Sequence, residues 1–93
     1  MIENNDQGNI LGKAFGIILS HLRRSVGLSQ EQLGFESGYH RTYISLLERG
    51  KKSPSLQTIF DLSKALNIDP TEFIKHVELE YEARLKSGEE GIK

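Results

Sequence analysis

The side chains best suited to recognition chemistry lie in one short run, Arg41-Thr42-Tyr43-Ile44-Ser45. The run places basic and hydroxyl groups on what the surrounding sequence predicts to be the first turn of a short helix. A helix that presents such a turn outward fits the major groove of double-stranded DNA, where base edges offer hydrogen-bond donors and acceptors. The run therefore predicts a helix that reads DNA.

Residues 28–50 predict the two short helices that would position this run. Ser29 offers an N-cap and Gln32 follows three residues later, which is a capping-box pattern. The first helix extends from there to about Ser37. The second helix spans about 41–48, and its inward residues are Ile44 and Leu47. Gly34 falls in the middle of the first helix at a cost of roughly 1 kcal/mol relative to alanine, and we expect the next helix to approach it closely.

Apolar residues at helical spacing predict three further helices around this pair. One covers about 11–24, one begins after a cap at Ser55, and one follows Asp69-Pro70, where an acidic cap precedes a proline at the first helical position. The predicted inward faces of the first and fourth helices contain Leu11, Phe15, Ile18, Leu19 and Leu22, and Leu56, Ile59, Phe60, Ser63 and Leu66. The sequence thus predicts an all-α, compact five-helix domain with an extended C-terminal helix.

The chain of 93 residues is expected to form one domain. Residues 1–10 show no hydrophobic period and predict a flexible N-terminal arm. Residues 11–86 predict the helical domain, in which about 70–86 form a dimerisation helix. Residues 87–93 contain two glycines and two glutamates, and they predict a frayed tail.

The net charge of −1 argues against nucleic-acid binding until its distribution is considered. Residues 11–68 carry eight basic and four acidic groups, a sum of +4, whereas residues 1–10 sum to −2 and residues 69–93, with four basic and seven acidic groups, sum to −3. Salt screens charges beyond about 8–10 Å, so a basic middle segment still presents a positive face. The overall acidity predicts weak non-specific binding.

Composition excludes several other classes of protein. The chain has no cysteine, so it can form neither a disulfide framework nor a thiolate metal site. His21, His40 and His76 lack the spacing of paired metal ligands, and neither a nucleophile motif nor a glycine-rich phosphate loop is present. No apolar run reaches the roughly 18 residues of a membrane span, and no signal peptide is predicted. We therefore expect a cytoplasmic protein that is not an enzyme and has no cofactor or metal.

The central segment resembles the Xre/Cro helix-turn-helix family, which includes phage repressors and restriction–modification controller proteins. The resemblance covers roughly residues 15–75, and it is carried by Gly27-Leu28-Ser29-Gln30-Glu31-Gln32-Leu33, Gly38, Tyr43-Ile44-Ser45, Leu47-Glu48-Arg49-Gly50 and Pro54-Ser55-Leu56. It implies a lambda-repressor-like fold and a sequence-specific regulator of transcription. The Arg-Thr-Tyr-Ile-Ser run is most similar to the controller-protein branch.

The resemblance implies that Arg41, Thr42, Tyr43 and Ser45 read bases. Arg41 would pair with guanine O6 and N7, and a pair of this kind discriminates by about 1–3 kcal/mol. Thr42 would bond a base edge or pack its methyl group on thymine. Tyr43 has an alternative role as a half-buried core residue, because tyrosine often packs its ring inside while its hydroxyl bonds at the surface.

Other matching positions imply contacts to the DNA backbone. Gln30 lies at the start of the first short helix, where an amide and backbone N–H groups suit a phosphate. His40 stands where many members of the family carry a serine or threonine cap. The remaining expected backbone contacts are Arg49, Lys51 and Lys52, and for the two lysines a solvated loop is the alternative. Arg23 and Glu48 match a structural ion pair of the family.

The last predicted helix carries an apolar row that extends beyond what one small core needs. Its expected dimer-interface residues are Phe73, Val77, Tyr81 and Leu85. The sequence thus predicts a homodimeric repressor or autoregulator on a palindromic operator, with two recognition helices roughly 34 Å apart. Two alternatives remain: the helix frays after about Val77, or the chain is an antitoxin or adaptor that binds another protein through this helix.

Overall fold

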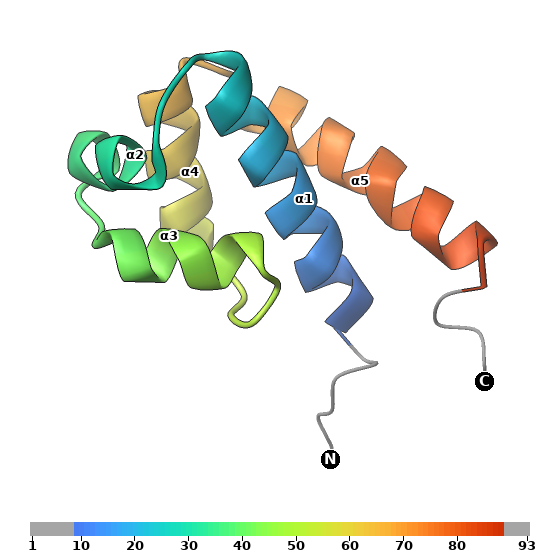
Figure 1. The fold of residues 1–93 in the computed structure, drawn as a ribbon. Coiled ribbons are helices and arrows are strands. Elements are labelled where there is room, and N and C mark those ends of the chain that lie inside the picture. Colours follow the sequence, from blue (N-terminus) through green and yellow to red (C-terminus); the bar gives the residue numbers. More distant parts are fainter. Residues whose placement is uncertain (1–8, 89–93) are drawn as a thin grey trace.

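The computed structural model describes residues 9–88, and this part of the chain forms five helices and no strand (Figure 1). The helices are α1 (Ile10–Ser25), α2 (Gln30–Ser37), α3 (Arg41–Glu48), α4 (Leu56–Leu66) and α5 (Pro70–Lys86). The predicted all-α, five-helix fold is confirmed. The residues predicted as most of the arm, 1–8, and as most of the tail, 89–93, lie outside the described part.

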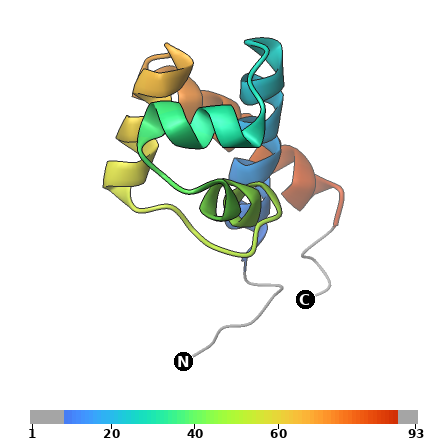
Figure 2. The same ribbon diagram turned by 60° about the vertical axis from the view of Figure 1, so that its left-hand side comes forward.

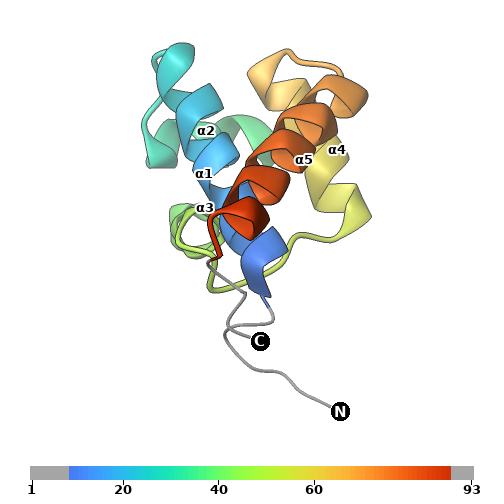
Figure 3. The ribbon, with the colours of Figure 1, turned by 90° about the vertical axis from the view of Figure 1, so that its right-hand side faces the viewer.

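The core lies where α1 crosses between α3 and α5, with α2 and α4 closing the remaining sides (Figures 1 and 3). Phe15 of α1 and Phe73 of α5 stack with ring centroids 5.1 Å apart. Around this pair the core consists of Ala14, Leu19, Leu33, Ile44, Leu47, Leu62, Leu66 and Val77. Every helix therefore contributes at least one apolar side chain to a single core.

Side chains at the predicted starts fix two of the helices, α2 and α4. Ser29 and Gln32 form both bonds of the capping box, at 3.0 and 2.8 Å. The Ser55 hydroxyl accepts from the Thr58 amide at 3.0 Å and starts α4. Asp69 precedes Pro70 as predicted, but its side chain makes no capping hydrogen bond.

Two glycines allow the helices to approach one another. A Cβ atom on Gly34 would lie 2.5 Å from the Tyr39 carbonyl oxygen, so this glycine makes room for the turn between α2 and α3. A Cβ atom on Gly16 would lie 2.4 Å from the Leu47 carbonyl oxygen. The close approach that we expected at Gly34 is thus present, and it involves the turn that leads into α3.

Three residues that the sequence placed on inward faces point outward instead. Leu11, Leu56 and Phe60 are exposed, and for Leu56 the exposed fraction reaches 72%. An apolar stripe on a surface helix spans little more than 100°. In α4 the buried positions are Thr58, Leu62, Ser63 and Leu66, so residues 56 and 60 lie beyond the edge of that stripe.

The ends of the domain also differ from the sequence prediction. Ile10, assigned to the flexible arm, is the first residue of α1 and is buried. Phe73 and Val77, assigned to a dimer interface, have exposed fractions of 0% and 4%. That assignment is wrong for both residues, because α5 uses them to cover α1 and no surface of theirs remains for a partner.

Candidate nucleic-acid interface

The two short helices meet in a tight turn that leaves the start of α3 at the surface (Figure 2). Ile44 and Leu47 are buried and hold one face of α3 against the domain. Arg41 and Thr42 on its first turn are exposed. No ion pair involving Arg41 is present within residues 9–88, so its guanidinium is available for an external acceptor.

His40 forms the N-cap of α3. Its backbone is extended, and its Nδ1 atom accepts a hydrogen bond from the Thr42 amide at 3.0 Å. The imidazole therefore replaces the hydroxyl that caps α2 and α4. Thr42 and Arg41, the two expected base-reading residues on this turn, follow directly after it.

A cluster of polar side chains connects the turn before α3 to α4, and sequence reasoning missed it. The Tyr39 hydroxyl donates to Asp61 Oδ2 at 2.6 Å, and Thr58 lies 3.3 Å from the same hydroxyl. The bond from Tyr39, together with a second bond from Gln57, lowers the pKa of Asp61 below its usual range. The same bond raises the pKa of Tyr39. Nothing in the sequence pairs positions 22 residues apart, so only the fold reveals this cluster.

Tyr43 belongs to the same cluster. Its side chain is partly buried, its ring centroid lies 5.2 Å from that of Tyr39, and its hydroxyl lies 3.3 Å from the Thr58 hydroxyl. This position favours the half-buried role that the sequence left open. The Ser45 hydroxyl also has a partner within the domain, because it accepts a hydrogen bond from Arg49 Nε at 3.3 Å.

The ion pair predicted between Arg23 and Glu48 is present and well enclosed. Arg23 Nε donates to Glu48 Oε2 at 2.6 Å, and the exposed fractions of the two side chains are 10% and 6%. Arg23 also donates to the Leu28 carbonyl oxygen at 2.8 Å. The carboxylate of Glu48, chiefly through its hydrogen bonds, raises the pKa of Arg23. This pair ties α1, the α1–α2 loop and the end of α3 together.

Gln30 joins this arrangement rather than standing alone at the start of α2. Its Nε2 atom donates to Glu48 Oε1 at 2.9 Å. The amide nitrogen is thus engaged, while the side chain stays partly exposed next to the exposed first turn of α2. The ends of the two short helices are therefore linked by one carboxylate.

Arg49, Lys51 and Lys52 are exposed and follow one another at the end of α3 and in the loop after it. The Gly50 carbonyl oxygen accepts from Asn9 Nδ2 at 2.8 Å, which connects this loop to the start of α1. The loop and the first turn of α3 give the two ends of the helix a basic character. Such charges suit the phosphate groups on either side of a groove.

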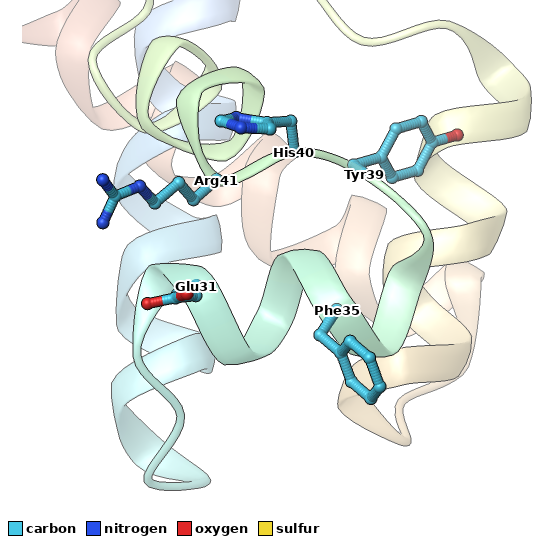
Figure 4. A pocket seen from close by; sticks show the side chains of 5 residues that line it. All are labelled: Glu31, Phe35, Tyr39, His40 and Arg41. Atoms are coloured by element: carbon cyan, nitrogen blue, oxygen red, sulfur yellow. The ribbon is translucent and has the colours of Figure 1, made fainter.

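The first turn of α3 and the first turn of α2 border a shallow cleft of about 440 Å³ (Figure 4). Its lining residues are Glu31, Phe35, Tyr39, His40 and Arg41. Tyr39 points toward α4, and Arg41 points to the opposite side. The cluster around Tyr39 therefore holds the turn from one side and leaves Arg41 exposed on the other.

Residues 9–88 lack two features, a cluster of metal-binding side chains and a membrane-spanning helix. No group of three or more histidine, cysteine, aspartate or glutamate side chains could hold a metal ion in that part of the chain. No helix there is both long enough and apolar enough to cross a membrane.

Comparison with known proteins agrees with this geometry. A sequence profile described as helix-turn-helix matches residues 19–73, which is more than half of the chain. An uncharacterized HTH-type transcriptional regulator of Sinorhizobium fredii is 37% identical over 62 residues, which cover 67% of this chain and 80% of that protein. The control protein C.BamHI of Bacillus amyloliquefaciens is 44% identical over 61 residues, which cover 64% of this chain and 75% of that protein.

A solved structure extends the likeness to three dimensions. The restriction-modification controller protein C.AhdI of Aeromonas hydrophila is 45% identical and superposes with a TM-score of 0.65, over 67% of this chain and 94% of that one. These relatives are regulators and control proteins, which agrees with the prediction that the chain is not an enzyme. The profile, the relatives and the five-helix fold together show that the chain belongs to the helix-turn-helix family of transcriptional regulators.

Proposed function

We propose that this regulator binds double-stranded DNA as a homodimer, with α3 of each protomer in the major groove of a palindromic operator. The observation that carries the proposal is the exposed first turn of α3, where Arg41 and Thr42 stand on a helix that is anchored from behind. A guanidinium and a hydroxyl on such a turn can bond base edges. The exposed cations after α3 supply attraction to the phosphates.

The site residues divide into three roles in this proposal. Arg41 and Thr42 read bases, while Tyr43 and Ser45 hold secondary places, since both already have partners within the domain. Backbone contacts come from Gln30, His40, Arg49, Lys51 and Lys52. A regulator that acts on DNA in this way works in the cytoplasm.

The test compares two variants on two kinds of DNA. Arg41→Ala should weaken binding to a selected duplex by about 5- to 150-fold, which is the value of one good base contact, and should change binding to random DNA little. Lys51→Ala should weaken binding to both duplexes about equally and lower the dependence of log K on log salt by about one. The selected duplex is the one that the protein itself recovers from a random pool. If Arg41→Ala weakens both duplexes to the same degree, the base-reading assignment is wrong.

The dimer interface that we propose differs from the one expected from sequence. Phe60 of α4 and Ile74 of α5 have exposed fractions of 51% and 43%, and they line one groove between these helices. Ile74 also borders a neighbouring apolar groove that reaches Leu11 and Pro54. Exposed apolar area of this kind marks an interaction site, and α4 and α5 lie side by side (Figure 3). A second copy on this face leaves both α3 helices exposed.

We further propose that the regulator represses or autoregulates transcription. This proposal is supported by two relatives, one a control protein and the other a restriction-modification controller protein. Binding to the DNA upstream of its own gene should exceed binding to random DNA by roughly a thousandfold or more at about 150 mM salt. Equal binding to both would exclude autoregulation.

The adaptor alternative has less support than the sequence suggested. It required an apolar row on α5 for another protein, but α5 commits Phe73 and Val77 to its own core. Tyr81 also packs partly against that core. Only Leu85 of the four expected residues is exposed.

A further inference from the structure

The recognition helix starts at a side chain that can change its charge, unlike the helices on either side of it. Serine hydroxyls cap α2 and α4, whereas an imidazole caps α3. The bond from the Thr42 amide to His40 Nδ1 measures 3.0 Å. This bond satisfies one of the backbone N–H groups that a helix start otherwise leaves unpaired.

Only one form of the imidazole can accept this bond. Nδ1 has a free lone pair only in the neutral ring that carries its proton on Nε2. When solvent supplies a second proton, Nδ1 becomes a donor and faces the Thr42 amide, which is also a donor. The positive charge also lies at the positive end of a helix, where it is unfavourable. Histidine is the side chain that ordinarily changes charge between pH 5 and 8.

The surroundings leave His40 open to solvent protons. It is exposed, and it borders the shallow cleft between α2 and α3 (Figure 4). Two groups of opposite charge, Glu31 of α2 and Arg41 of α3, also line that cleft. Tyr39 from the preceding turn has its hydroxyl engaged with Asp61 of α4.

We propose that His40 is a positioning residue for base reading, which acts by ordering the first turn of α3 only while its imidazole is neutral. The inference depends on the proposed function, because Arg41 and Thr42 on that turn are its base-reading residues. A helix of eight residues has little stability of its own, so the loss of its cap frees that turn. The cation that replaces the cap attracts phosphate regardless of sequence. Discrimination between sequences therefore falls as pH falls.

The experiment measures the ratio of affinities for the selected duplex and for a scrambled duplex of the same composition, at pH 8 and at pH 5.5. The ratio for the wild-type protein should fall by about fivefold, which corresponds to the roughly 1 kcal/mol value of an N-cap. His40→Asn retains a capping side chain that does not titrate. The affinity ratio of this variant should therefore be the same at pH 5.5 as at pH 8. His21→Asn, on the exposed side of α1, is the matched control and should behave as the wild type does.

A second readout separates this inference from the proposed function. The protection of the Thr42 amide against hydrogen exchange, relative to its intrinsic rate at each pH, should drop at pH 5.5 in the wild type and hold in His40→Asn. If no duplex is selected from the random pool, the proposed function fails and this amide alone decides the role of His40. The proposal would be overturned if the affinity ratio or the protection of the Thr42 amide fell at pH 5.5 in His40→Asn as it does in the wild type. It would also be overturned if neither quantity fell in the wild type.

Discussion

At the scale of single residues, the Arg23–Glu48 pair shows how one carboxylate holds α3 in place. Glu48 accepts from Arg23 of α1 and from Gln30 of α2, and it is itself the last residue of α3. A pair this enclosed fixes geometry more than it adds net stability, since both ions have lost water. The removal of one partner, however, leaves the other charge without compensation.

We therefore expect Glu48→Gln to lower the free energy of unfolding by about 3 kcal/mol, as the loss of one partner of a buried pair does. Urea titration at pH 7 measures this change. The half-exposed pair of Glu72 and His76 on α5 offers a matched control. Glu72→Gln should change stability by no more than about 0.5 kcal/mol, and an equal loss in both variants would contradict the role of burial.

The bond between Tyr39 and Asp61 leads to a prediction about pH. Because that bond lowers the pKa of Asp61, its contribution is fully present above the unfolded value of about 3.9 and is lost as pH falls through the lower folded value. Tyr39→Phe should therefore raise the pKa of Asp61 and destabilise the domain at pH 7. The difference in free energy of unfolding between Tyr39→Phe and the wild type should be smaller at pH 3 than at pH 7.

Carboxyl chemical shifts and urea titrations at several pH values measure these effects. Tyr43→Phe is the control, because the Tyr43 hydroxyl contacts Thr58 and makes no bond to Asp61. In Tyr43→Phe the pKa of Asp61 should be the same as in the wild type. A stability gap for Tyr39→Phe that stays the same from pH 7 to pH 3 would show that the Tyr39 hydroxyl bonds the Asp61 carboxylate no more strongly than the protonated carboxyl group.

Partners such as these mark the limit of sequence reasoning at the residue scale. Ser29 and Gln32 were predictable as a capping box because their bonds are local and depend only on spacing. The sequence predicts that Gln30 contacts a DNA phosphate. In the structure its side chain instead donates a hydrogen bond to Glu48, which is 18 residues away. Such a contact depends on how α2 is rotated against α3, and no local pattern encodes that rotation.

At the scale of helices, the turn between α2 and α3 depends on Gly34. Alanine there would gain roughly 1 kcal/mol in helix propensity, but its Cβ atom would lie 2.5 Å from the Tyr39 carbonyl oxygen. Crowding against the backbone of a packed turn costs about 1–3 kcal/mol, and here the turn must move as well. We expect Gly34→Ala to reduce stability by about 2 kcal/mol in thermal or urea unfolding.

Glu36→Ala, at an exposed position of the same helix, is the companion measurement. It changes helix propensity only slightly and crowds nothing, so its stability should stay within about 0.5 kcal/mol of the wild type. If Gly34→Ala is as stable as Glu36→Ala, the turn has more freedom than the packing indicates.

The helices themselves were the most predictable part of the fold. Caps, glycine stops and apolar period gave all five, and α1 differs from its expected range by one residue at each end. The orientation of their faces was less predictable. Leu56 and Phe60 fit the apolar period of α4 as well as the buried residues do, and only the positions of α2 and α5 decide which side of α4 is covered.

At the scale of the whole molecule, the exposed apolar groove between α4 and α5 predicts the oligomeric state. Phe60→Glu places a charge at the centre of the proposed interface, and burial of an unpaired charge is costly. In sedimentation equilibrium the wild type should be dimeric, and this variant should be monomeric at the same concentrations. Its affinity for the selected palindromic duplex should fall by at least tenfold, because one half-site must then bind alone.

Leu85→Glu distinguishes this interface from the one that the sequence suggested. Leu85 is exposed near the end of α5 and does not line the groove that contains Phe60 and Ile74. The variant should remain dimeric. If Leu85→Glu is monomeric and Phe60→Glu is dimeric, the interface lies at the C-terminal end of α5 and not in the groove between α4 and α5.

The contact between Tyr39 and Tyr43 gives the domain an intrinsic optical probe. The chain contains three tyrosines and no tryptophan, and two of the three lie with ring centroids 5.2 Å apart at the start of α3. Tyrosine emission is sensitive to whether the hydroxyl bonds a carboxylate, as that of Tyr39 does. The fluorescence of the unlabelled protein should therefore report chiefly on the turn that precedes α3, so that DNA titrations can be followed without an attached dye.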